Sequence, residues 1–82
     1  MQNIKIYFLS ASSGKSENGD FYRVTLNISE QTNGGERNYS ADFFVEIELF
    51  AKTKSFEKFQ EVDAIFIPTS SGRARLVSIE GL

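Results

Sequence analysis

Hydrophobic and polar side chains alternate along much of the chain, and this period of two predicts β-strands with one face toward a core. In the stretch from Asp20 to Ser29, the inward positions are Tyr22, Val24, Leu26 and Ile28, and the outward ones begin with Phe21 and Arg23. The same alternation and the turn residues around it give five expected strands: Asn3–Leu9, Asp20–Ser29, Arg37–Phe50, Val62–Pro68 and Arg73–Ile79.

The segments between these strands carry turn and helix signals. Ser10–Gly19 is small and polar, and we expect a flexible loop there. Asn33-Gly34-Gly35 suits a hairpin turn with positive φ angles. A short helix is expected over Lys52–Gln60, with Ser55 as its N-cap and with Phe56 and Phe59, three residues apart, facing the core.

The third expected strand is unusually long and places large rings outward. Its inward set is Tyr39, Ala41, Phe43, Val45, Ile47 and Leu49. Phe44 and Phe50 fall on the other face, beside Glu46 and Glu48. Such rings are either open for a ligand or covered by a helix or a second subunit, and a bulge in the strand would exchange the two faces.

The order β-β-β-α-β-β in 82 residues predicts one domain, residues 1–82, folded as a five-stranded oligonucleotide-binding (OB) barrel with one short helix. A strand of this length is typical of a curved strand that serves two sides of a barrel. The main alternative is a five-stranded barrel of the SH3-like type, which would place or shorten the helix differently.

Composition excludes several kinds of chemistry. The chain has no Cys and no His, so disulfides, Cys/His zinc sites and Ser-His-Asp triads are excluded, and we expect no cofactor and no enzymatic activity. No apolar run is long enough to span a membrane, and Met1 leads into a strand-like segment, which favours a cytoplasmic protein. The net charge of −2 requires any phosphate-binding surface to be a local basic patch, whereas eight Phe and three Tyr leave rings for a surface.

Four stretches of the chain, "GDFYRVTLNI", "FFVEIELFAKTKSFEKF", "EVDAIFIP" and "GRARLVSIEGL", carry a resemblance to a known family. The first is similar to the second strand of the bacterial and phage single-stranded DNA-binding proteins, the second to their third strand and helix, and the other two fit their last two strands. The resemblance implies base-stacking roles for Phe44 and Phe50 and places Lys52 on the family's following lysine. Ala51 stands where the family has Gly, the Gly-Arg-Leu motif of the first strand is missing, and the sequence stops at Leu82 with no flexible linker or acidic tail. These departures fit either a minimal phage- or plasmid-type version of the family or a relative with another use.

The expected function is sequence-independent binding of single-stranded DNA, with RNA left open, in replication, recombination or transfer of a mobile element. Aromatic rings stack on any base, and basic side chains hold the phosphates. The candidate binding residues are Phe44, Phe50, Phe21, Arg23, Arg37, Lys52, Arg73, Arg75, Tyr7 and Lys5. We expect a homodimer or homotetramer, since an exposed edge strand favours pairing. The alternative function is an OB domain for protein–protein contact with replication, recombination or conjugation proteins.

Overall fold

The computed structural model describes residues 4–82, and these form one antiparallel sheet of five strands with a short helix. The strands are β1 (Ile4–Ser16), β2 (Gly19–Thr32), β3 (Gly35–Val45), β4 (Glu61–Pro68) and β5 (Ala74–Gly81). Helix α1 (Ile47–Lys52) and the 3₁₀ turn η1 (Thr53–Ser55) connect β3 to β4. The predicted order, with the helix between the third and fourth strands, is confirmed, while Met1 and Asn3 lie outside the described residues.

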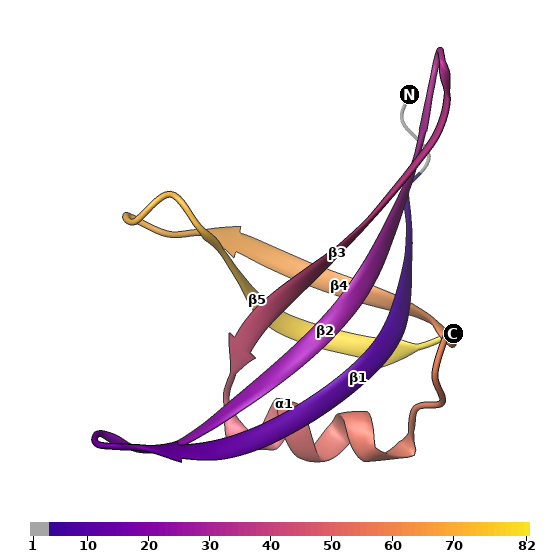
Figure 1. Ribbon diagram of the computed structural model, residues 1–82. Coiled ribbons are helices and arrows are strands. Elements are labelled where there is room, and N and C mark those ends of the chain that lie inside the picture. The colour runs from indigo at the N-terminus through magenta and orange to yellow at the C-terminus, as the bar shows by residue number, and fades with distance from the viewer. Residues whose placement is uncertain (1–3) are drawn as a thin grey trace.

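The strands follow one another across the sheet in the order β3-β2-β1-β4-β5. Figure 1 shows β1, β2 and β3 as long curved strands, with β4 and β5 crossing behind them and α1 below. The core lies between these two layers and consists of Phe8, Val24, Leu26, Val62, Leu76 and Ile79. In residues 4–82 no backbone pairing joins the edge strands β3 and β5, so the described sheet is open.

The alternation predicted for the second strand is confirmed. Val24 and Leu26 are fully buried, whereas Thr25 between them is half-buried and Arg23 before them is exposed. The turn that follows this strand also forms as expected: Thr32 pairs with Gly35 across Asn33 and Gly34. Gly35 has a φ of 125°, a backbone conformation that favours glycine.

The expected loop over Ser10–Gly19 is wrong, because β1 continues to Ser16 and pairs with β2 along its whole length. A register shift between Phe8 and Ser10 leaves Leu9 as an extra residue. Beyond it, small polar side chains such as Ser12 point to solvent, where they cost a strand little. Pairing with the apolar β2 therefore overrides their weak strand propensity.

The third strand ends earlier than expected, at Val45, and the segment from Ile47 is helical. Leu49 and Phe50 are half-buried and Thr53 is buried, a spacing that suits one face of a helix. The predicted inward position of Ile47 is wrong, since 52% of its surface is exposed. Phe50 therefore does not lie on the outward face of a strand.

The helix predicted over Lys52–Gln60 is correspondingly displaced. Ser55 is the last residue of η1 rather than an N-cap, and its hydroxyl donates to the carbonyl of Lys52 at 3.1 Å. Phe56 packs edge-on against Phe8 with ring centroids 5.7 Å apart, which confirms its inward direction. Phe59 does not face the core, because 63% of its surface is exposed.

The β2–β3 hairpin extends past the core as an arm (Figure 1). Tyr39 lies on this arm and is 46% exposed, so its predicted inward position is wrong. Ile4, paired with Glu30 near the base of the arm, is also exposed at 53%. The side chains of the arm still alternate between its two faces, but β4 and β5, which form the opposite layer, do not extend far enough to cover the inward ones (Figure 1).

Candidate nucleic-acid interface

The surface of β1, β2 and β3 that is turned away from the core, here called the outer face, brings the candidate residues together. Antiparallel pairing places side chains of neighbouring strands side by side on one face. From one end of the outer face to the other, the rows are Gly14 and Phe21; Ser12, Arg23 and Phe44; Ser10, Thr25 and Asp42; Tyr7, Asn27 and Ser40; and Lys5, Ser29 and Asn38.

An aromatic pair occupies one end of the outer face. The rings of Phe21 and Phe44 meet edge to face, with centroids 6.0 Å apart and an interplanar angle of 83°. The absence of a side chain at Gly14 makes room for Phe21, because a Cβ there would lie 2.6 Å from the ring's Cζ. Phe44 remains 66% exposed, so the outward direction predicted for it is confirmed. Phe44 therefore presents an exposed ring, and the ring of Phe21 packs against it.

A basic side chain lies next to this pair. Arg23 is exposed and stands directly opposite Phe44 in the register of β2 and β3. The ion pairs formed within residues 4–82 are Lys52–Glu80 and Arg75–Glu46. The guanidinium of Arg23 therefore has no carboxylate partner in the described chain and can donate to a phosphate oxygen or stack beside a base.

Phe44 also lines a cleft that reaches the β4–β5 hairpin. The cleft has a volume of about 410 Å³, and Arg73 and Arg75 lie on its opposite wall. Arg75 donates to Glu46 at 2.9 Å across the cleft, so part of its charge is already neutralised. Arg73 retains its charge, which makes it the better phosphate ligand of the two.

The middle of the outer face is polar and uncharged apart from one carboxylate. The hydroxyl of Thr25 donates to Asp42 at 2.5 Å, which holds that carboxylate against the neighbouring strand. Ser10, Asn27 and Ser40 lie in the adjacent positions. These groups can donate to or accept from base edges without excluding any particular base.

The structure gathers seven of the ten candidates around this face and separates the other three from it. Tyr7 and Lys5 share the outer face with the aromatic pair. Phe50 lies on α1 and packs against Tyr22 on the core side of β2, with the two ring centroids 5.0 Å apart. Lys52 is ion-paired with Glu80. Arg37 stands opposite Glu30 on the β2–β3 arm, at a position of β3 whose side chain alternates to the face opposite the outer face. The outward strand position expected for Phe50 was wrong because the third strand ends at Val45. Arg37 flanks the β2–β3 hairpin as expected, but the arm carries it away from the outer face.

The interface includes residues that sequence reasoning missed. Gly14 was placed in a loop, whereas it lies in β1 and stands opposite Phe21. Lys58 and Phe59 line a further cleft on the outer face, together with Leu9, Ser10, Thr25, Asn27 and Ser40. Helical spacing suggested burial for Phe59, and no local pattern indicated its exposure.

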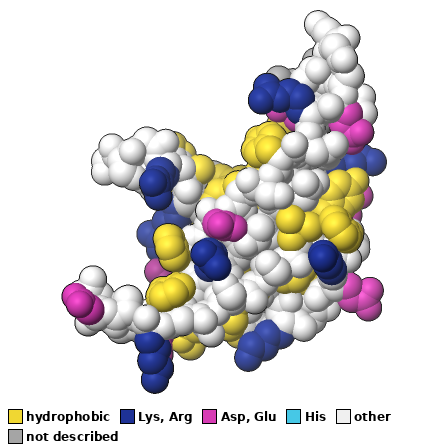
Figure 2. All heavy atoms as spheres, viewed as in Figure 1, with side chains coloured by type: hydrophobic (Ala, Val, Ile, Leu, Met, Phe, Trp, Pro, Cys, Tyr) yellow, Lys and Arg dark blue, Asp and Glu magenta, His cyan; other side chains and the backbone are white. Residues whose placement is uncertain are grey.

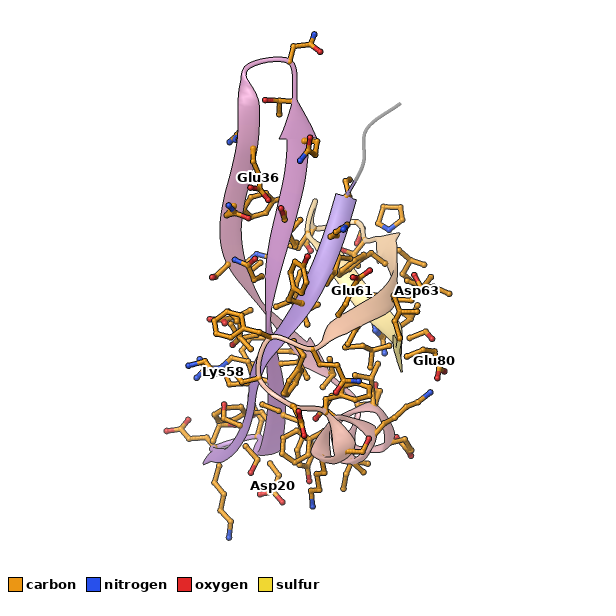
Figure 3. The ribbon with its side chains drawn as sticks, turned by 90° about the vertical axis from the view of Figure 1, so that its right-hand side faces the viewer. Asp20, Glu36, Lys58, Glu61, Asp63 and Glu80 are labelled. Carbon is orange, nitrogen blue, oxygen red and sulfur yellow. The ribbon has the colours of Figure 1, made fainter. Side chains whose placement is uncertain are left out.

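Charged side chains of both signs lie on the β1–β3 side of the molecule. In Figure 2, which views this side, hydrophobic side chains form separate groups to the left and right, with Lys or Arg beside both and with Asp or Glu also in view. In Figure 3, Lys58 projects from this side, whereas Asp63 and Glu80 lie on the opposite one.

No protein-family model matches the chain, and the searches of curated proteins and of solved structures found no match either. Neither helix in residues 4–82 has the length and apolar character needed to cross a membrane. The same part of the chain contains no group of three or more acidic side chains placed to hold a metal ion.

Proposed function

We propose that this protein binds single-stranded nucleic acid without sequence preference, through the outer face of an OB-type sheet. The five strands with a helix between β3 and β4 support this fold type, which includes partly open five-stranded barrels. The expected substrate is single-stranded DNA in replication, recombination or mobile-element transfer, with RNA as the alternative.

The observation that carries the proposal is the exposed ring of Phe44, supported by Phe21 and placed beside the unpaired guanidinium of Arg23. Leaving a phenyl ring two-thirds exposed gives up the free energy of burying it, and a stacked base recovers part of that. Base–aromatic stacking contributes about 1–3 kcal/mol per base and does not depend on base identity. Arg23 and Arg73 on either side of the ring suit the phosphates that flank a stacked base.

Fluorescence polarisation with a labelled oligo-dT tests the proposal. We expect saturable binding at low salt that weakens steadily as salt rises, since phosphate contacts release counterions. Phe44→Ala and Phe21→Ala should each reduce affinity by about 5- to 150-fold, which corresponds to one lost stacking contact. Leu82→Ala, which removes an exposed apolar side chain just after β5, is the matched control and should not change affinity.

Two results would refute this function: absence of saturable binding at low salt, or binding that does not respond to salt. Competition between oligo-dT and oligo-U of equal length distinguishes a preference for DNA from one for RNA. Circular dichroism of each variant separates loss of binding from loss of fold.

A second candidate function, protein–protein contact, is favoured by the apolar surface of the β4–β5 hairpin. Ile65, Ile67 and Val77 are 55%, 43% and 41% exposed on these two adjacent strands. Such a surface suits a homodimer, a homotetramer or a replication partner. Sedimentation of Ile65→Asp tests it: loss of an oligomer with oligonucleotide binding intact assigns this surface to association and the outer face to nucleic acid.

A further inference from the structure

Phe59 combines two features that packing does not explain. Its ring is 63% exposed, although a helical spacing would have buried it. Its φ is 65°, and it is the only non-glycine residue within 4–82 with a positive φ. A phenylalanine in the left-handed region costs about 1–2 kcal/mol, and strain of this kind concentrates at functional sites.

The backbone holds this conformation firmly. The Phe59 N–H donates to the carbonyl of Phe8 at 2.6 Å, and the Phe8 N–H donates to the carbonyl of Gln60 at 2.8 Å. These two bonds attach the segment to β1 next to the bulge at Leu9. The ring is therefore fixed beside the sheet while its surface stays open.

The ring of Phe59 and the side chain of Lys58 form one wall of a cleft of about 640 Å³. The opposite wall belongs to the outer face and contributes Ser10, Thr25, Asn27 and Ser40. The ammonium of Lys58 lies 5.5 Å from the ring centroid of Phe59. A stacking surface, a cation and several hydroxyl and amide groups thus surround one open space.

We propose that Phe59 and Lys58 form a second nucleobase subsite, over the polar middle of the outer face and apart from the end that carries Phe44. In this subsite, Phe59 stacks on a base, Lys58 contacts the adjoining phosphate, and Asn27 and Ser40 bond to the base edge. The inference rests on the proposed function and extends it: the strand would run across the outer face between the two rings.

The register sets the separation of the two subsites. Arg23 stands opposite Phe44, and Asn27 stands opposite Ser40, four residues further along each strand. At a rise of about 3.3 Å per residue, the two positions lie about 13 Å apart along the strands. With about 3.4 Å per stacked nucleotide, this distance takes on the order of four nucleotides, and fewer if the strand is extended.

Binding measurements with oligonucleotides of two lengths therefore distinguish the contributions of the two subsites. Wild-type protein should bind an oligo-dT of about ten nucleotides more tightly than one of about three, within the site sizes known for OB folds. Phe59→Ala should reduce affinity for the longer oligonucleotide by about 5- to 150-fold and leave the shorter one unchanged. Lys58→Gln should lower the salt slope for the longer oligonucleotide by about 0.7. Leu82→Ala remains the control.

Tryptophan fluorescence can report contact with the oligonucleotide at each subsite without removing the aromatic ring. The chain contains no tryptophan, so Phe59→Trp and Phe44→Trp each introduce a single tryptophan, which is excited at a wavelength that the three tyrosines do not absorb. We expect both oligonucleotides to quench the Phe44→Trp variant and only the longer one to quench Phe59→Trp.

Unchanged fluorescence of Phe59→Trp on saturation with the longer oligonucleotide would overturn the second subsite while leaving the proposed function standing. An equal loss of affinity for both lengths in Phe59→Ala would overturn it as well. Absence of binding to either length by the wild type would overturn the proposed function itself.

Discussion

Gly14→Ala is a sharp test of the aromatic pair, because it adds one methyl group beneath Phe21. The new Cβ would lie 2.6 Å from Cζ and 2.9 Å from Cε1 of that ring. Ordinary carbon contacts are about 3.5–4.0 Å, so the ring must shift by roughly 1 Å. Phe21 would then lose its edge contact with Phe44, which at 6.0 Å is within the favourable range.

The expected effect on stability is small. Glycine inside a strand costs roughly 0.5–1 kcal/mol relative to alanine, and the Gly14 backbone is free of positive φ. Loss of the Phe21–Phe44 contact costs about 0.5–1.5 kcal/mol. These contributions nearly cancel, so the free energy of unfolding in urea should change by less than about 1 kcal/mol.

The expected effect on binding is larger, because the supported ring pair is disturbed. Affinity for oligo-dT, measured by fluorescence polarisation, should fall about tenfold, equivalent to about 1.4 kcal/mol. Ser12→Ala is the matched control, since Ser12 is the next outward position of β1 and stands opposite Arg23. If the NMR contacts between the Phe21 and Phe44 rings persist in Gly14→Ala, the steric reasoning is refuted.

Three further predictions concern the core, the strained residue and the phosphate contacts. Leu26→Ala should lower the free energy of unfolding by about 2–5 kcal/mol in urea titrations, because Leu26 is fully buried. Phe59→Asn should raise the free energy of unfolding by roughly 0.5–1 kcal/mol, because Asn adopts a φ of 65° more readily than Phe does. An unchanged melting temperature would contradict the backbone strain inferred at this residue. Arg23→Gln should reduce the slope of log affinity against log salt by about 0.7, and an unaltered slope would exclude a phosphate contact.

Strand positions were predictable where alternation and turn chemistry agreed. Val24 and Leu26 follow from period two alone, and Asn33-Gly34 marks its hairpin without reference to the rest of the chain. The exposed position of Phe44 also followed from alternation, because β3 remains a strand as far as Val45.

The boundary between β3 and α1 could not be located in this way. Val45, Ile47 and Leu49 fit a strand, but Leu49 and Thr53 fit a helix equally well, and a short apolar run does not distinguish the two. Contacts with Tyr22 and the core decide the outcome. Phe50 was misplaced for this reason.

The cleft beside Phe59 could not be predicted from the sequence, for a different reason. It joins Phe59 to Asn27 and Ser40, which are far apart in the chain and meet only because the segment before β4 bonds to β1 at Phe8. No local pattern encodes such a meeting. The same holds for Gly14, whose importance depends on which residue of β2 it faces.

The gap between β3 and β5 gives the Phe44 cleft an adjustable width. Phe44 is carried by one edge of the sheet and Arg73 by the hairpin beyond the other, and no backbone ladder ties these edges together within residues 4–82. The Arg75–Glu46 bridge across the gap is exposed, and such bridges contribute at most about 1 kcal/mol. Under the proposed function, small movements of the hairpin would let the cleft accept purines and pyrimidines in turn, limited by the contact of Phe66 with Phe43 at a ring-centroid distance of 5.1 Å.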